Sequence, residues 1–232
     1  MTRTFLIVTA LVAGVAATAE AQICAGTAPF TAGQMRVGAS AEFPTDAKTF
    51  GGEFAWGQPN GLYLGGTVAR TSDNNNADLN AMDFGAHGGY EVRFQSMPKL
   101  RFCPTASFGY MSGPNVGPVE SSTMHYSIGG SVGSVISASD NVAIVPSASL
   151  SWVGARQKDT QGSTSATASD GWGQARLAAG IVFNRAITLA PVVTIPLSDV
   201  GGDTRFGFAA SYNFGSRGGV VQQGGRKGSR RR

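Results

Sequence analysis

The feature that most constrains this chain is an alternation of apolar residues with small or polar ones, which repeats every second position. It extends over residues 34–214 and restarts after each group of turn residues. Successive side chains of a β-strand point to opposite faces of the sheet, so this period is typical of strands with two different faces. The pattern therefore predicts an all-β domain.

Ten alternating runs can be identified, and most are near the about 9–11 residues that a tilted strand needs to cross a bilayer. Their apolar positions span residues 35–43, 50–56, 62–68, 82–94, 100–110, 124–132, 142–152, 175–183, 187–197 and 206–214. Short connections alternate with longer polar segments, which we interpret as loops, at residues 72–80, 112–121 and 156–170. An even number of strands with short turns at one end and long loops at the other predicts a ten-stranded antiparallel up-and-down transmembrane β-barrel.

The second face of each strand distinguishes a membrane barrel from a secreted soluble β-protein. A soluble protein would bury the apolar face and cover its exterior with Lys and Glu. Here the alternate positions are mostly Gly, Ser, Thr and Ala, and the whole chain has only four lysines. Small polar residues suit the confined lumen of a small barrel, and the bulky aromatics lie near the strand ends, as in interfacial girdles. We therefore predict that the apolar face contacts lipid.

The two ends of the chain differ from this central region. Residues 1–21 have a basic start at Arg3, an apolar stretch and the small-x-small sequence Ala19-Glu20-Ala21, which predict a cleaved secretory signal. No later run approaches the about 20 apolar residues of a membrane helix. We expect a periplasmic segment at residues 22–33, the barrel at residues 34–214 and a disordered tail at residues 215–232.

The last alternating run has the sequence Arg205-Phe206-Gly207-Phe208-Ala209-Ala210-Ser211-Tyr212-Asn213-Phe214. With it, residues 34–214 resemble the small bacterial outer-membrane β-barrels, the broad group of OmpA-like and OmpX-like barrels. The resemblance implies an outer-membrane location and contact with outer-membrane lipid. It also implies that the barrel-assembly machinery reads Phe206, Phe208, Tyr212 and Phe214. Members of this group commonly end at the final Phe, whereas this chain continues for 18 residues.

Cys24 and Cys103 are the only cysteines of the chain. An even pair in an exported protein favours a disulfide over two free thiols, and closing so long a loop is worth about 4 kcal/mol in the chain-entropy model. Both residues belong on the periplasmic side of the predicted barrel. The bond would hold residues 23–33 against the barrel mouth or inside the lumen, as a partial plug.

Charged residues and both histidines of the chain occupy predicted lumen positions. They are Arg36, Glu42, Glu53, Asp83, His87, Glu91, Arg93, Arg101, His125, Arg176 and Arg205. Because both signs occur, the set predicts pairing across the interior rather than a selectivity ring of one sign. Two interpretations stay open: an ion-pair network that fills the barrel, and a gate or narrow pore for small solutes.

The basic net charge is concentrated in the tail. Its cations are Arg217, Arg226, Lys227, Arg230, Arg231 and Arg232, and it has no acidic residue. The rest of the chain carries a small net negative charge, which excludes a basic nucleic-acid-binding surface on the barrel. Anionic lipid or the cell wall could attract the tail.

The sequence does not favour an enzyme. Residues 129–133 match the G-x-S-x-G string of serine hydrolases, but they lie within a strand and no histidine follows Ser131. The ten-stranded omptin proteases use paired aspartates and a His–Asp couple on long loops, and these loops carry neither. We expect no cofactor and no metal. The predicted function is a structural or narrow-channel, porin-like role, and the alternative is an adhesin or receptor that binds through residues 72–80 and 156–170.

Overall fold

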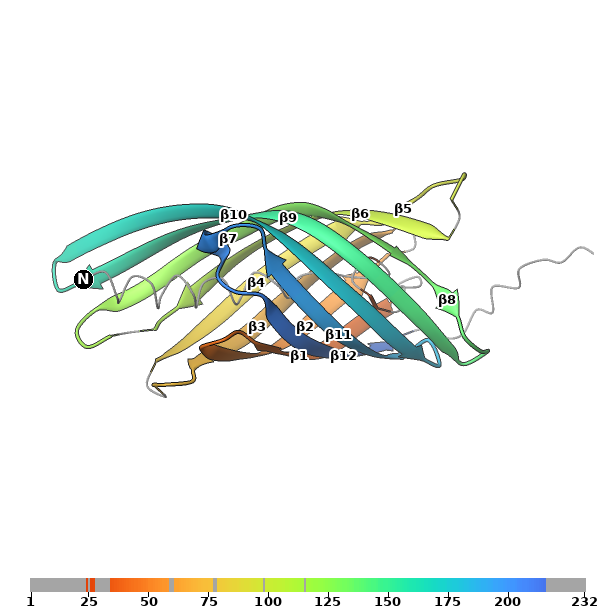
Figure 1. Ribbon diagram of the computed structural model, residues 1–232, viewed down its shortest axis with the longest axis horizontal. Coiled ribbons are helices and arrows are strands. Elements are labelled where there is room, and N and C mark those ends of the chain that lie inside the picture. The colour runs from red at the N-terminus through yellow and green to blue at the C-terminus, as the bar shows by residue number, and fades with distance from the viewer. Residues whose placement is uncertain are drawn as a thin grey trace, which may run out of the picture.

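The computed structural model describes residues 24, 26–27, 34–58, 61–76, 79–97, 99–114 and 116–215. Within these residues, the chain forms a closed, all-antiparallel β-barrel of ten strands (Figure 1). Two barrel strands are each interrupted once and therefore carry two labels: β4 continues into β5 after Glu91, and β7 into β8 after Val135. The labelled segments are β1 (Gln34–Phe43), β2 (Ala47–Gly57), β3 (Leu62–Asp73), β4 (Asn80–Tyr90), β5 (Val92–Arg93), β6 (Leu100–Ser112), β7 (Glu120–Ser134), β8 (Ile136–Ser137), β9 (Val142–Gln161), β10 (Thr164–Phe183), β11 (Ile187–Pro196) and β12 (Arg205–Phe214).

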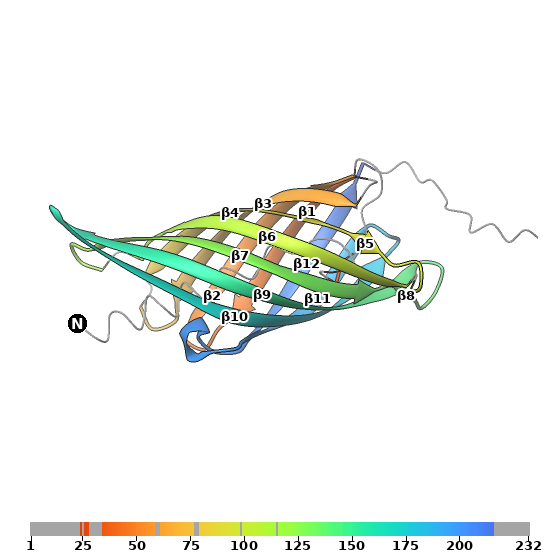
Figure 2. The same cartoon turned by 90° about the horizontal axis from the view of Figure 1, so that it is seen from above.

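The barrel closes where the first strand meets the last. β1 pairs with β12 from Met35 opposite Phe214 to Phe43 opposite Phe206. Each strand therefore has a neighbour on both sides across the barrel wall, and its backbone N–H and C=O groups bond within the wall. The wall is seen from two directions in Figures 1 and 2.

The two faces of the wall are chemically opposite, as β7 illustrates. Its outward residues Met124, Tyr126 and Ile128 are 49%, 54% and 64% exposed, whereas His125 between them is 6% exposed. The same inversion holds around the barrel, with apolar side chains outside and Gly, Ser, Thr and charged residues inside. So large an exposed apolar surface is the lipid-facing exterior of a transmembrane barrel. The sequence prediction of fold and facing is thus confirmed.

Among the described residues, no helix has the length and apolar character needed to cross a membrane.

The prediction of a long loop at residues 156–170 is wrong. The structure continues β9 to Gln161 and starts β10 at Thr164, so these residues form a β-hairpin that turns at Gly162, whose φ is +60°. The segment alternates Ser and Thr with Ala and has no proline, a composition compatible with strand, and its polarity reflects contact with water rather than lack of structure. In both views the hairpin extends past the other strand ends (Figures 1 and 2). The other two long connections are shorter than expected, at residues 74–79 and 113–119.

Outward-facing side chains on β9 indicate where the bilayer ends. Leu150 and Trp152 are apolar and exposed, whereas Arg156 and Lys158 on the same face are exposed and charged. Aromatic residues favour the membrane interface and charges lie beyond it. The boundary of the lipid therefore falls between Trp152 and Arg156.

This placement predicts that an added charge has a depth-dependent cost. Leu150→Arg should lower the free energy of unfolding by about 1–2 kcal/mol, because the charge would sit in lipid between the interface and the bilayer midplane. Thr160→Arg, on the same strand and face but above the membrane, should change it by no more than about 0.5 kcal/mol. Urea titration of the protein folded in lipid vesicles measures both values, and equal costs would contradict a membrane boundary between Trp152 and Arg156.

Candidate functional site in the barrel lumen

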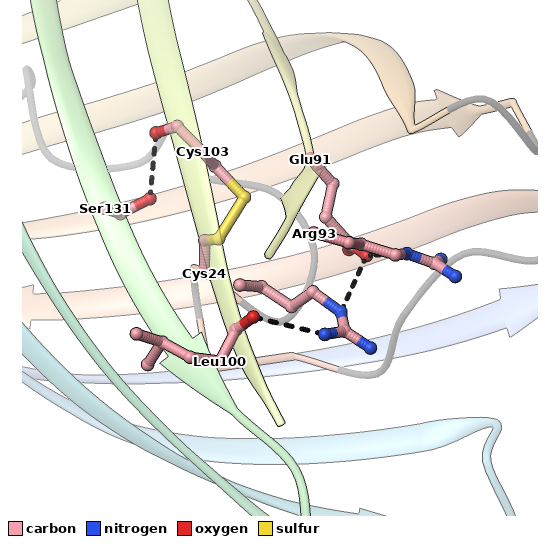
Figure 3. The surroundings of a disulfide bond; sticks show 7 residues. Cys24, Glu91, Arg93, Leu100, Cys103 and Ser131 are labelled. Carbon is pink, nitrogen blue, oxygen red and sulfur yellow. Dashed lines mark hydrogen bonds and ion pairs between the residues drawn. A yellow bond between two sulfur atoms is a disulfide. The ribbon is translucent and has the colours of Figure 1, made fainter. Parts of the chain in front are cut away.

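The described part of the N-terminal segment is anchored inside the barrel by a disulfide. Cys24 is bonded to Cys103 of β6, with 6.1 Å between their Cα atoms and a sequence separation of 79. Both cysteines are fully buried, and Figure 3 shows the bond beside β6. The predicted pairing is confirmed.

The same segment also contacts β9 and β10, which lie two and three strands from β6 along the wall. Gly26 lies against β9 and β10, where a Cβ built on it would be 3.1 Å from Cβ of Ala178 and 3.2 Å from Oγ of Ser147. Gly180 of β10 faces the carbonyl oxygen of Gly26 so closely that any side chain at Gly180 would overlap it. Gly26 has a φ of +73°, which favours glycine at this position. Residues 24 and 26 thus bridge β6 and β10, three strands apart on one side of the lumen; this bridge is called the crossing below.

Charged side chains fill the wall next to this crossing. The Nε group of Arg36 donates to Oδ1 of Asn213 at 2.9 Å, and Nη2 of Arg205 donates to Oε1 of Gln174 at 2.9 Å. Glu53 interacts electrostatically with Arg36 and Arg176, and Glu42 with Arg176 and Arg205. β10, β11, β12, β1 and β2 are consecutive in the sheet, so this group forms one patch of alternating sign on the inner wall.

A second polar group lies on β3, β4 and β7. Nε2 of His125 and Oδ2 of Asp83 are 2.6 Å apart, and both side chains are buried. The ring of His87, on the same strand as Asp83, lies 6.2 Å from the ring of Tyr63. The aspartate therefore pairs with the histidine of another strand and not with that of its own.

A third group marks the turn end of the barrel. Oε1 of Glu91 lies 3.1 Å from Nε of Arg93 and 3.3 Å from Nε of Arg101 (Figure 3). The side chain of Glu91 is 2% exposed and that of Arg93 is 64% exposed. Arg93 therefore lies at the rim of the barrel, where its side chain reaches water. Its assignment to the lumen stays a prediction.

An apolar cluster occupies the lumen toward the loop end. It joins side chains from four strands: Ala81, Met111, Val153, Ala155 and Trp172. Trp172 is only 2% exposed. The sequence analysis missed this cluster because it assigned large apolar residues to the lipid face. The alternation along β10 could have indicated it. Trp172 lies two and four residues before Gln174 and Arg176, so all three side chains share the lumen face, and all three are buried.

A small cavity lies beside the crossing. Its volume is about 40 Å³, and it is lined by Thr27, Glu53, Arg176, Thr188 and Ser211, together with small residues. This volume holds a few water molecules at most. Among the described residues, no group of three or more His, Cys, Asp or Glu side chains is arranged to hold a metal ion.

The remaining residues singled out in the sequence are Ser131 and the aromatic residues of β12. Ser131 is not on a strand-to-helix turn; it lies within β7, where its hydroxyl donates to the carbonyl oxygen of Cys103 at 3.5 Å (Figure 3). Phe206, Phe208 and Tyr212 are exposed on the outer face of β12, and Phe214 stacks on Tyr212 with 6.3 Å between ring centres. Their recognition by the assembly machinery stays a prediction. The predicted signal at residues 1–21 and all but the first residue of the tail lie outside the described residues.

Comparison with known proteins identifies a fold. No family model matches the chain, and no curated protein matches its sequence. The β domain of the Bordetella autotransporter BrkA aligns with a TM-score of 0.50 at 11% identity, covering 79% of this chain and 98% of that domain. The N-terminal β-barrel domain of Pseudomonas aeruginosa OprF aligns with a TM-score of 0.37 at 9% identity, covering 79% of this chain and 98% of that one. The Escherichia coli outer-membrane protease OmpT aligns with a TM-score of 0.40 at 8% identity, covering 79% of this chain and 94% of that one.

The chain has the fold of the bacterial outer-membrane β-barrels, as its resemblance to that group implied. Its apolar exterior agrees with a location in the outer membrane.

The contact between Gly26 and Gly180 provides a test of the crossing. Gly180→Ala should lower the free energy of unfolding by about 1–3 kcal/mol, because the new methyl group forces the Gly26 carbonyl away from β10. It should also slow formation of the Cys24–Cys103 bond, measured by alkylation of free thiols during oxidative refolding. Gly66→Ala is the matched control, since a Cβ at Gly66 would have its nearest neighbour at 3.6 Å. Equal behaviour of the two variants would contradict the close packing of Gly26 against β10.

Proposed function

We propose that this protein is a non-enzymatic, structural barrel of the outer membrane whose lumen is closed by its own N-terminal segment. The observation that carries the proposal is the crossing of that segment from Cys103 on β6 to Gly180 on β10. A covalent anchor at β6 and close packing against β10 hold the segment in place. Solute passage through the lumen is blocked in this state.

The side chains around the crossing favour a closed lumen over an open, porin-like lumen. Charges of opposite sign face each other on the wall at Glu53, Arg36 and Arg176 instead of forming a ring of one sign. Toward the loop end, Trp172 and Met111 belong to an apolar cluster within the lumen, and apolar side chains there oppose the passage of ions. Two barriers of different chemistry thus lie in series along the barrel axis.

Planar-bilayer recording tests the proposal directly. The oxidised protein should show no stable channel, whereas deletion of residues 22–33 should raise ion conductance at least several-fold, because the crossing is removed. Cys24→Ser, which removes only the covalent anchor, should give intermittent openings. Ser131→Ala is the control, because it alters the neighbour of Cys103 and keeps the bond.

Steady conductance of the oxidised protein, equal to that of the deletion variant, would overturn the closed-lumen proposal. A heat-dependent shift in SDS gel migration must be the same for all variants, which shows that each one retains the barrel.

A second candidate function is an adhesin or receptor that binds above the membrane through residues 72–80 and 156–170. The observation that favours it is the hairpin of β9 and β10, which extends past the other strand ends (Figure 2) and consists mainly of polar residues. Binding to immobilised ligands by the hairpin-deleted protein, compared with the full chain, tests this candidate independently of conductance.

A further inference from the structure

One edge of the hairpin has no strand beside it. β10 pairs with β9 along its whole length, from Thr164 to Phe183, but its pairing with β11 begins only at Gln174. The backbone of Leu197 is hydrogen-bonded to that of Gly173, and the short 3₁₀ helix Asp199–Gly201 packs near Trp172. Beyond that point, no described strand pairs with residues 164–171 of β10 on this side.

The phase of the hydrogen bonds shows which backbone groups lie on this open edge. The N–H group of Leu197 donates to the carbonyl oxygen of Gly173 at 2.8 Å, so Gly173 points its backbone away from β9. Backbone direction alternates along an antiparallel strand, and the register between β9 and β10 has no bulge. The N–H and C=O groups of Ser165, Thr167 and Ser169 therefore point to the open edge.

The part of this edge from Thr164 to Ser169 carries none of the features by which proteins block edge pairing, and the first charge along it is Asp170. Exposed edges are usually protected by Lys, Pro or a bulge. Residues 164–169 read Thr-Ser-Ala-Thr-Ala-Ser and contain neither a charge nor a proline. All of them except Ala168 are exposed. The edge is thus available to another extended strand.

The sequence along the edge reads the same in both directions. Ser165-Ala166-Thr167-Ala168-Ser169 is a palindrome centred on Thr167. If a second copy pairs antiparallel about that centre, Thr167 faces Thr167, Ser165 faces Ser169 and Ala166 faces Ala168. The first two pairs fall on the positions whose backbone points to the edge, and the close, non-bonded positions receive the small Ala side chains.

We propose that this edge binds the same edge of a second copy of this chain, antiparallel and with Thr167 on the two-fold axis. The paired region would form one continuous sheet through β10, because β7 and β9 are already paired at this height, from Glu120 opposite Thr160. Antiparallel pairing of two hairpins that rise from their barrels places the barrels end to end. The two copies would then belong to facing membrane surfaces. The inference gives the second candidate function a defined partner and is independent of whether the lumen conducts.

Cysteine pairs test the register. Ala166→Cys and Ala168→Cys proteins, purified separately in detergent and then mixed and oxidised, should give a disulfide dimer, because residue 166 faces residue 168 of the other copy. Each protein alone should give several-fold less, since its two cysteines would be diagonal neighbours about 7–8 Å apart. The native cysteines do not interfere, because they are bonded to each other. Equal dimer yields in all three samples, or no dimer in any, would overturn the proposed pairing.

A proline on the edge tests the interaction without cysteines. Thr167→Pro removes an N–H group that points to the open edge and not to β9, and edge strands tolerate such a proline. Sedimentation of the full chain in detergent should show a concentration-dependent dimer that Thr167→Pro weakens about tenfold or more. Thr167→Ala, which keeps the N–H group, should dimerise like the native chain. A native chain that stays monomeric at high concentration, or a proline variant that dimerises equally well, would refute the proposal.

Discussion

Satisfaction of every backbone hydrogen bond within the hydrocarbon layer is the constraint on which this structure depends. Lipid offers no partner to an N–H or C=O group, so a sheet that crosses a membrane must close on itself. The pairing of β1 with β12, from Met35 to Phe43, supplies that closure. Once the wall is closed, the period-2 alternation assigns every side chain either to lipid or to the lumen. The apolar exterior is then a consequence of the solvent and not a defect in packing.

Closure creates an interior that must be filled. Large polar side chains such as Arg36 and Arg205 are removed from bulk water there, and each finds a hydrogen-bond partner on another strand. The N-terminal segment occupies part of the same space, with the disulfide holding it at β6 and glycine at residues 26 and 180 allowing backbone to touch wall. Filling by charge pairs, by an apolar cluster around Trp172 and by the chain's own end are three solutions to one packing requirement.

The number of strands, the lipid-facing side of each strand and the disulfide could be predicted from the sequence. The first two depend on the local alternation of residues, and the disulfide depends on export to an oxidising compartment. Alternate residues of a strand point to opposite faces. Leu150 and Trp152 therefore face lipid, and Ser149 and Ser151 face the lumen. What the sequence could not show depends on contacts between distant strands. Nothing local shows that Asp83 pairs with His125 instead of His87, or that Gly180 lies under Gly26. The hairpin at residues 156–170 was missed for a different reason: polar Ser and Thr in a strand above the membrane look like a loop when strands are recognised by their apolar face.

That hairpin also shows where the closure rule ceases to apply. Within the bilayer, an unpaired strand edge would leave backbone groups without partners, and β10 has β11 beside it there from Gln174 onward. Above the bilayer, water can satisfy the edge, so β10 can continue to Thr164 without a neighbour. The charged residues Arg156 and Lys158 on the adjacent strand mark the same transition. An open edge is therefore permitted only in the part of the barrel that another protein can reach. The end of β11 divides β10 into a part that builds the wall and a part that remains available for pairing.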